Sequence, residues 1–372
     1  MTEASNLPLL VPLLAFALAA VFGAVAHKVN FCTMGAITDI ANFGDWRRMR
    51  MWLLAIAVAI AGTAALVGNG LIDTTKSIYL NAQVPWLSNI VGGFLFGFGM
   101  TLSSGCGSKT LLRVGAGNLK SLIVLVFLAI SAYMTLRGLL AIPRANGLDT
   151  LRLDLSSLGA AASDLGTLGT AMGLGTAAKL WVPFLVAAAI GAFVFMNRDF
   201  RATRELIVGG VVIGLVIVGG WYISGQIGFL AEDPATLEEK FVATNSGRLE
   251  SYSFVAPTAY LLELLIFWTD KTRVVTFGIA GVLGMVAGAT LMALATRTFR
   301  WEGFTNTEDL VNHIVGAILM GFGGVVALGC TIGQGLTGIS TLALGSILAF
   351  GGIVVGCLAA VRYQIWRIDR MG

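Results

Sequence analysis

The segment "IVGGFLFGFGMTLSSGC" at residues 90–106 has a second copy in the chain, "IVGAILMGFGGVVALGC" at residues 314–330. The two copies align without gaps at an offset of 224 residues, and nine of the 17 positions are identical. Each copy is a long apolar run that ends at a Gly-Cys pair. At the same offset the apolar run 275–295 corresponds to 51–71. The chain therefore contains one structural unit twice.

The composition is that of a membrane protein. Of the 372 residues, 56% are hydrophobic and only 12% are charged, and the mean hydropathy is +0.85. Soluble domains carry about 25% charged residues. Apolar runs long enough to cross a bilayer as helices recur along the whole chain. The net charge of +4 lies mostly in short loops between these runs, which argues against binding to nucleic acid.

The hydropathy pattern predicts about nine transmembrane helices and four shorter apolar segments. Short pieces at membrane depth indicate re-entrant or broken helices, which are tolerated where they line a cavity or are buried in protein. The expected spans are 7–28, 49–71, 88–104, 118–140, 180–197, 205–224, 274–295, 311–329 and 340–362, and the short segments are 31–43, 106–116, 253–268 and 330–338.

The two copies of the unit should have opposite orientations in the membrane. Each copy has four spans, and one additional span lies between them, so the second copy starts on the other side. Inverted repeats of this kind are typical of transporters, with the substrate site at the repeat interface. We predict an all-α polytopic protein with a first repeat at 1–140, an external loop and extra span at 141–204, and a second repeat at 205–372.

Loop charges indicate the orientation of the chain. The segments 45–50 and 197–204 are basic and are expected in the cytoplasm. Nine crossings then put the N-terminus outside and the basic C-terminus inside. The first apolar run lacks a preceding basic region and is expected to remain as a span. The insertions 141–179 and 225–252 are expected on the external side.

The four cysteines do not resemble a disulfide scaffold or a metal site. There is no C-x-x-C pair, and the chain has only two histidines. We therefore expect no metal and no cofactor. Cys357 lies in "GGIVVGCLAAV" with no polar neighbour and is expected to act as a small packing residue.

The two Gly-Cys segments predict a site for a small anion. A new short helix follows each Gly-Cys, and the N-terminus of a helix presents free N–H groups and a partial positive charge. In an inverted repeat two such N-termini can face each other across the membrane midplane, where they would hold an anion. Gly105, Gly107 and Gly329 are expected to let the backbone turn and approach this ligand.

The side chains in these segments favour a soft, sulfur-bearing anion. A neutral thiol is a weak donor and is polarizable, and weak serial sites favour passage of a ligand. The alternative is that Gly-Cys only marks tight helix packing. The expected ligand donors are Cys106 and Ser108, with Thr110, in the first copy, and Cys330, Thr331 and Gln334 in the second.

Other polar residues have two possible roles. Lys109 and Arg113 lie on one helix face and either draw an anion toward the cytoplasmic mouth or form a solvated helix end. Cys32 starts another short helix but corresponds to Ala256 in the second copy. Cys32 lies either on the pathway or in a packing contact, and a pathway role would have no equivalent in the second repeat. Asp39 and Glu263 occupy equivalent positions and are interpreted as structural partners of a nearby arginine or backbone group.

Three segments resemble the cysteine segments of the YeeE/YedE family of bacterial inner-membrane thiosulfate transporters. They are "NFCTMGAITD" (30–39), "GFGMTLSSGCGSKTLLR" (97–113) and "GFGGVVALGCTIGQGLTGIS" (321–340). The resemblance implies an hourglass-shaped inverted repeat with a central path for thiosulfate. It also implies that Cys32, Cys106 and Cys330 pass the anion on through S–H hydrogen bonds, and that a small cytosolic TusA-like sulfurtransferase is a partner in sulfur assimilation.

Two other functions are compatible with the residues. A membrane thiol enzyme or persulfide carrier would use Cys106 or Cys330 as a nucleophile, but no base stands beside either cysteine in the sequence. A channel for another small anion would not need the thiols. We therefore expect a transporter in the lipid bilayer rather than an enzyme.

Overall fold

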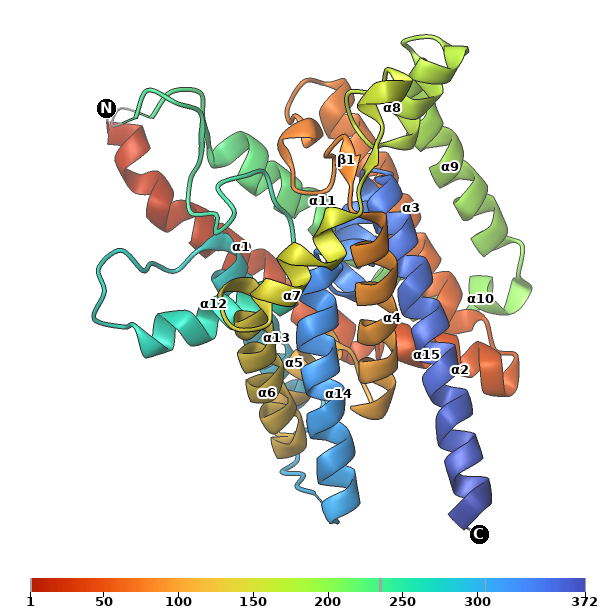
Figure 1. Cartoon of the computed structure of the whole chain (residues 1–372). Coiled ribbons are helices and arrows are strands. Elements are labelled where there is room, and N and C mark those ends of the chain that lie inside the picture. Colours follow the sequence, from red (N-terminus) through yellow and green to blue (C-terminus); the bar gives the residue numbers. More distant parts are fainter. Residues whose placement is uncertain (1, 234–235, 305, 372) are drawn as a thin grey trace.

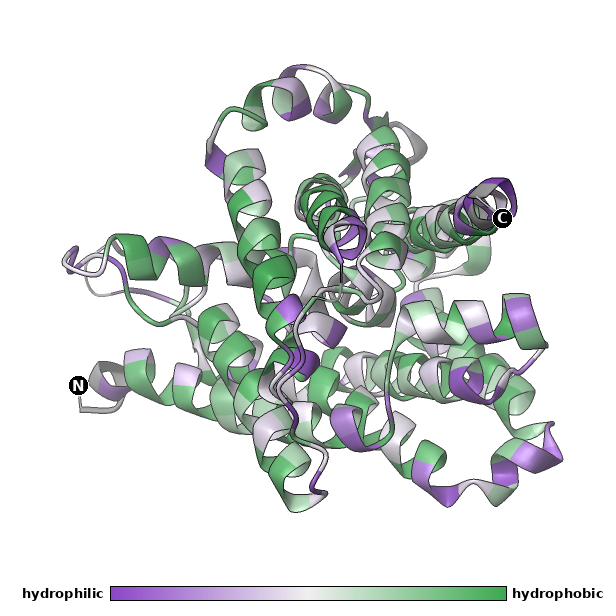
Figure 2. Cartoon of the chain, turned by 90° about the horizontal axis from the view of Figure 1, so that it is seen from below, coloured by the Kyte–Doolittle hydropathy of each residue, from purple (hydrophilic) through white to green (hydrophobic). Residues whose placement is uncertain are grey.

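The computed structural model describes residues 2–233, 236–304 and 306–371. Within these ranges nine helices are long and apolar enough to span a membrane, which confirms the predicted number (Figure 1). Seen from below, the long helices are mostly hydrophobic and the polar residues concentrate in loops and helix ends (Figure 2). The helices are α1 Thr2–Lys28, α3 Arg47–Gly68, α4 Trp86–Leu102, α6 Leu119–Arg137, α9 Ala178–Phe195, α11 Arg204–Tyr222, α13 Phe277–Ala295, α14 Thr307–Val326 and α15 Leu344–Met371.

The four short apolar segments are also helical. They form α2 (Thr33–Phe43), α5 (Gly107–Gly115), α12 (Val255–Ile266) and the π-helical turn η6 (Gly333–Gly338). Because α2, α5 and η6 follow Cys32, Cys106 and Cys330, all three cysteines stand just before a short helix, as predicted.

The remaining elements are short and lie in the loops. Two small antiparallel sheets pair β1 with β2 and β3 with β4. The segment after α6 contains several single turns of helix. The bounds are η1 Thr74–Lys76, β1 Gln83–Val84, α7 Ala141–Asn146, η2 Leu148–Thr150, β2 Leu153–Asp154, η3 Ser156–Leu158, α8 Leu165–Gly169, η4 Thr170–Leu174, α10 Arg198–Ala202, η5 Ile223–Ile227, β3 Phe229–Leu230 and β4 Lys240–Phe241.

The two halves of the chain pack in the same way. Helix α1 packs on α13 just as α11 packs on α3, and α4 packs on α15 just as α14 packs on α6. The short helices follow the same rule, since α2 contacts α15 and α12 contacts α6. Exchanging each of these elements for its repeat counterpart therefore reproduces the pairings; the counterparts are 224 residues apart except for α1 and α11, which precede the insertion 225–252.

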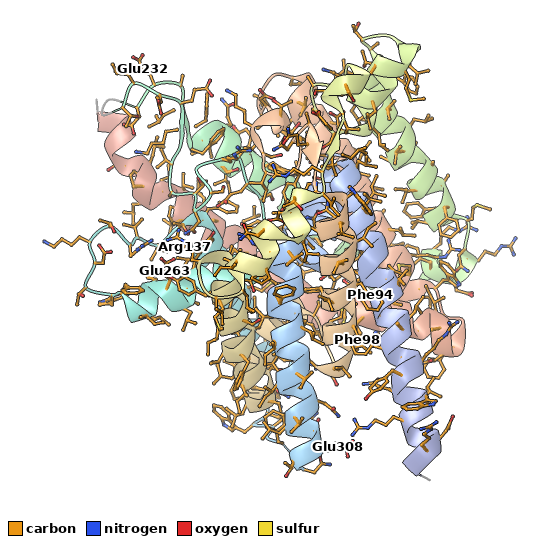
Figure 3. The ribbon with its side chains drawn as sticks, viewed as in Figure 1. Phe94, Phe98, Arg137, Glu232, Glu263 and Glu308 are labelled. Atoms are coloured by element: carbon orange, nitrogen blue, oxygen red, sulfur yellow. The ribbon has the colours of Figure 1, made fainter. Side chains whose placement is uncertain are left out.

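The equivalent helices α4 and α14 run in opposite directions. Phe94 lies above Phe98 on α4, whereas Glu308, near the start of α14, lies at the bottom of the molecule (Figure 3). The repeat is thus inverted, as the odd number of intervening spans predicts.

Four glycines hold α4 and α14 together. A Cβ added to Gly92 would lie 2.8 Å from the carbonyl oxygen of Gly323, and one on Gly99 would lie 2.6 Å from that of Gly316. Gly316 and Gly323 are the repeat counterparts of Gly92 and Gly99. Gly92 therefore packs against the counterpart of Gly99, and Gly99 packs against the counterpart of Gly92. A two-fold axis between the two antiparallel helices requires this pattern. Small residues of this kind let helix backbones approach closely in a membrane.

An ion pair supports each half of the bundle. Arg48 lies 3.3 Å from Asp39, and Glu263 is held by Arg137 at 3.3 Å and Arg273 at 3.0 Å (Figure 3). The two acids occupy equivalent positions, and both have arginine partners, which confirms their interpretation as structural residues. The Glu263 side chain is only 4% exposed, compared with 24% for Asp39.

The glycine contact predicts a sharp effect of one methyl group. In the Gly92→Ala variant the new Cβ would lie 2.5 Å from the backbone nitrogen of Ala327, which cannot move independently. We expect a loss of about 1–3 kcal/mol, typical of overpacking, measured as a lower thermal-unfolding midpoint in detergent. Gly351→Ala is the control, because nothing lies within 4 Å of its added Cβ. Equal stability of the two variants would contradict the proposed role of the contact.

The ion pairs predict unequal effects of two equivalent substitutions. Glu263→Gln leaves two arginines without their carboxylate and should destabilise the fold by about 2 kcal/mol, less than for a fully buried pair because both arginines are partly exposed. Asp39→Asn should have a smaller effect on the same thermal-unfolding measurement. A larger loss for Asp39→Asn would show that burial does not set the strength of these pairs.

Candidate functional site

The three cysteines share one local backbone design. The residue two positions before each of them has a positive φ: 52° at Asn30, 56° at Ser104 and 60° at Leu328. At such a helix end the next N–H reaches back to a carbonyl five residues earlier. These bonds are present at all three sites, at 2.9 Å for Phe31, 2.8 Å for Gly105 and 2.8 Å for Gly329. Each long helix thus ends in a left-handed turn that places a cysteine before the next helix.

The predicted role of the glycines as turn residues is wrong. The left-handed residues are Ser104 and Leu328, one position before Gly105 and Gly329. A Cβ on either of these glycines would instead press on the side chain of Lys109 or Gln334 at 3.2 Å. Gly107 has room for a Cβ, whose nearest neighbour would be a Leu128 methyl at 3.7 Å. The turn therefore rests on a serine and a leucine, each at a cost of about 1–2 kcal/mol.

The three thiols are buried but have different hydrogen-bond partners. Cys32 accepts from the N–H of Gly35 at 3.4 Å, and Cys330 accepts from the N–H of Gly333 at 3.4 Å. Each of these thiols therefore caps the helix that follows it. The Cys106 thiol does not cap α5 and lies 3.2 Å from the hydroxyl of Ser108. Lys109, three residues after Cys106, hydrogen-bonds Asn30, two residues before Cys32, so the turns of these two cysteines lie side by side.

The polar groups around Cys330 are less completely paired than those around Cys106. The hydroxyl of Thr110 donates to the carbonyl of Cys106 at 3.0 Å and is not available to a ligand. By contrast, the Thr331 hydroxyl and the Oε1 atom of Gln334 are buried and have no partner among the described residues. The Nε2 of Gln334 donates to the carbonyl of Ala327. A ligand beside Cys330 would thus find two unpaired polar atoms.

The two cations of α5 lie beside the Cys32 turn. Lys109 donates to the side-chain oxygen of Asn30, and Arg113 donates to the carbonyl of Ser104 at 2.8 Å. Both charges are within electrostatic range of Cys32. Both are half-buried, and Lys109 joins the Cys32 turn to the Cys106 turn, so they are not a freely solvated helix end. Cys357 accepts from Thr101 at 3.3 Å between α15 and α4, in line with a packing role.

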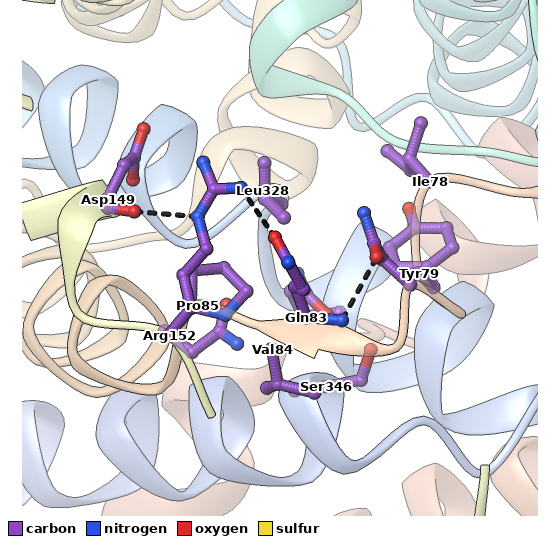
Figure 4. Close-up of a pocket in the computed structure, with 13 residues that line it drawn as sticks. Ile78, Tyr79, Gln83, Val84, Pro85, Asp149, Arg152, Leu328 and Ser346 are labelled. Atoms are coloured by element: carbon purple, nitrogen blue, oxygen red, sulfur yellow. Dashed lines mark hydrogen bonds between the residues drawn. The ribbon is translucent and has the colours of Figure 1, made fainter. Parts of the chain in front are cut away.

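Two cavities are lined by Leu328, two positions before Cys330, and most of their other residues were not predicted from the sequence. One, of about 200 Å³, is lined by Tyr79, Glu250, Ser253 and Gly329 among others. The other, of about 170 Å³, is lined in part by Asn89, Gln334 and Ser346 (Figure 4). Asn89 and Ser346 could have been noticed as polar residues inside apolar spans. Tyr79 and Glu250 lie in loops, where no periodic pattern identifies them. Among the described residues no cluster of His, Cys, Asp and Glu could hold a metal.

Comparison with known proteins gives matches over most of the chain. The family model described as "Sulphur transport" matches residues 28–359. A protein of Escherichia coli K12 named thiosulfate transporter TsuA is 27% identical over 332 residues, covering 85% of this chain and 84% of that protein. A protein of the same name from Spirochaeta thermophila is 27% identical over 334 residues, covering 88% of this chain and 91% of the relative.

Glu250 predicts a pH-dependent stability. Burial raises the pKa of its carboxyl to about 7, although Ser246 donates to Oε2 at 3.1 Å. Because the folded-state pKa lies above the unfolded value, the charged form destabilises the fold as pH rises through 7. Glu250→Gln should therefore raise the thermal-unfolding midpoint at pH 8 and leave it nearly unchanged at pH 5. Glu238→Gln, an exposed acid of the same segment, is the control. An equal gain at both pH values would contradict this explanation.

Proposed function

Because this chain belongs to the sulphur transport family, we propose that it is a transporter that takes up thiosulfate across a membrane. Both relatives are named for that substrate. The nine apolar helices supply the membrane-spanning part that such a role needs. The observation that carries the proposal is the set of three buried cysteines, each between a left-handed turn and the start of a short helix.

The chemistry of these turns suits a soft anion. A helix N-terminus attracts negative charge, and each thiol adds a weak, polarizable donor that can follow the sulfur of the ligand. We propose that thiosulfate passes from Cys330 to Cys106 to Cys32 by S–H hydrogen bonds, with no covalent step. Gly105, Gly107, Ser108 and Gly329 form the walls of the two turns, and Thr331 and Gln334 contact the anion at the Cys330 end.

The cations of α5 fit the inner end of this path. Lys109 and Arg113 stand beside Cys32, so they can hold the anion as it leaves the central thiol. Their polar partners are neutral, namely the Asn30 amide and the Ser104 carbonyl, and their charge is therefore not cancelled in these contacts. The corresponding polar residues after Cys330, Thr331 and Gln334, are uncharged, so the two ends of the proposed path differ.

Orientation and partners follow from the same proposal. The basic segments 45–50 and 197–204 favour the cytoplasmic side, which puts the N-terminus outside and the C-terminus inside a bacterial inner membrane. The units 1–140, 141–204 and 205–372 are proposed as first repeat, external loop with extra span, and second repeat. A small cytosolic TusA-like sulfurtransferase is the proposed consumer of the imported thiosulfate.

Uptake of labelled thiosulfate into proteoliposomes tests this function. Cys106→Ala and Cys330→Ala should each abolish uptake, because each removes the donor at one step of the path. Cys32→Ala should reduce or abolish it. Cys357→Ala is the matched control, since this cysteine is equally buried but lies inside α15, where its thiol accepts from Thr101. Thermal unfolding of all four variants verifies that they fold.

Uptake that survives both Cys106→Ala and Cys330→Ala would refute the thiol relay. Mass spectrometry after exposure to thiosulfate separates the relay from covalent chemistry. Unmodified thiols are expected, whereas a stable persulfide or S-thiosulfonate on Cys106 or Cys330 would indicate a persulfide carrier instead.

A further inference from the structure

The cavity of about 200 Å³ beside Gly329 reaches the backbone that holds the outermost thiol of the proposed path. Ser253 and Tyr79 are part of its lining. A Cβ added to Gly333 would lie 2.6 Å from the hydroxyl oxygen of Ser253 and 3.6 Å from that of Tyr79. The N–H of Gly333 in turn donates to the Cys330 thiol at 3.4 Å. The cavity wall therefore meets the residue whose N–H binds this thiol, although the thiol itself lies outside the lining.

Three hydroxyl groups of this cavity have no hydrogen-bond partner among the described residues. They belong to Tyr79, Ser253 and Tyr260, which come from the loop after η1, the segment before α12 and α12 itself. Tyr79 is only 8% exposed and also lines the neighbouring cavity (Figure 4). Leaving a buried hydroxyl unpaired is unfavourable, and a hydroxyl can donate as well as accept. Three donors around one cavity indicate a ligand that carries acceptor atoms, as an oxyanion does.

The Glu250 carboxyl lines the same cavity and has no cationic partner in the part of the chain that the structure describes. Its Oε1 atom is buried and unpaired within these ranges, and its Oε2 atom accepts from the hydroxyl of Ser246 at 3.1 Å. Because the carboxyl is largely withdrawn from water, its pKa rises to about 7. Glu250 therefore gains and loses a proton near neutral pH.

The charges on neighbouring elements do not compensate Glu250. The titratable groups around it are Lys76 and Tyr79 from η1 and the loop after it, Arg137 from α6, Arg144 from α7 and Tyr260 from α12. The two tyrosines and the Cys330 thiol are neutral near pH 7. Each cation has an acid of its own, at 2.7 Å for Lys76, 3.3 Å for Arg137 and 3.8 Å for Arg144. A negative charge on Glu250 would therefore act on any ion that enters the cavity.

An anion in this cavity requires a proton on Glu250. A carboxylate and a bound anion repel each other strongly where little water screens them, and a carboxylate has no hydrogen to donate. The protonated carboxyl is neutral and becomes a further donor. The binding of the proton and the binding of the anion are therefore linked, and each raises the affinity for the other by the same factor.

We propose that this cavity is the entry site for the transported anion, bound by the hydroxyls of Tyr79, Ser253 and Tyr260, and that a proton from the outer solution binds Glu250 together with it. This inference rests on the proposed function and adds a control of its first step. Acid in the outer solution increases the affinity of the site for thiosulfate, and alkali decreases it.

The site belongs to one face of the molecule. At the offset of 224, Tyr260 corresponds to Ala36 and Ser253 to Val29, neither of which has a hydroxyl. Glu250 lies in the insertion 225–252, which has no equivalent in the first repeat. Proton-linked binding is therefore expected at the Cys330 end of the path and not at the Cys32 end.

Uptake of labelled thiosulfate at two outer pH values, with the membrane potential clamped, tests the role of Glu250. The KM of the wild type should rise about tenfold from pH 6 to pH 8, because the carboxyl loses its proton over this range while thiosulfate stays a dianion. Glu250→Gln is always neutral, so its KM should be nearly the same at both pH values and close to that of the wild type at pH 6. Glu238→Gln, in an exposed position, should keep the tenfold change.

Tyr79→Phe tests the donors separately from the proton. The substitution removes one hydroxyl and keeps the ring that packs on Trp221. It should raise the KM about fivefold at both pH values, the effect of one lost hydrogen bond. An unchanged KM would show that water alone pairs with this hydroxyl and would overturn the assignment of the cavity as the entry site.

Calorimetry separates this site from the transport function. Thiosulfate binding to the purified protein at pH 8, measured in two buffers of different ionisation enthalpy, should take up about one proton per anion in the wild type and about none in Glu250→Gln. A pH effect on KM that persists in Glu250→Gln would overturn the proposal. If the proton is taken up as expected but no thiosulfate enters the vesicles, the site stands and the proposed function fails. Uptake with a KM independent of pH would refute the site and leave the function intact.

Discussion

The contact between the backbones of α4 and α14 determines where the cysteines lie. Both helices end one turn before a cysteine, and they cross through Gly92, Gly99, Gly316 and Gly323 without side chains between them. Because the crossing is antiparallel, the two helices end on opposite sides of it. Cys106 and Cys330 therefore stand on opposite sides of this crossing, each at the end of one of the two helices. Larger side chains between α4 and α14 would move the two helices apart. The N-termini of the short helices after Cys106 and Cys330 would then not face the same thiosulfate path.

Much of this architecture could be predicted from the sequence, because its causes are local or periodic. The length of an apolar run determines whether a helix can span, and the 224-residue offset relates α2, α3, α4 and α6 of one half to α12, α13, α14 and α15 of the other. The same offset identified Asp39 and Glu263 as equivalent, and a carboxylate in an apolar helix needs a partner. The antiparallel arrangement followed from the odd number of intervening spans.

The remaining features depend on tertiary contacts that have no repeat. Serine and leucine are not residues that favour a left-handed conformation, so nothing in "SSGC" or "ALGC" marks Ser104 and Leu328 as the turn. The surrounding packing imposes that conformation. Likewise, Tyr79 and Glu250 reach the cavity beside Gly329 from loops whose course depends on the whole fold. Asn89 and Ser346 are visible as polar residues, but only the structure brings them to one cavity.

The unequal faces of the molecule limit what the protein can control. If one face offers a polar cavity and the other offers Lys109 and Arg113, half-saturation is reached at different concentrations on the two sides. Microscopic reversibility nevertheless requires the forward and reverse fluxes to balance at equilibrium. Without a coupled ion, the final ratio of inner to outer anion is set by the membrane potential alone, which opposes the inward movement of negative charge. Binding asymmetry thus governs how fast the anion enters at low concentration, and a downstream consumer is needed to keep it flowing inward.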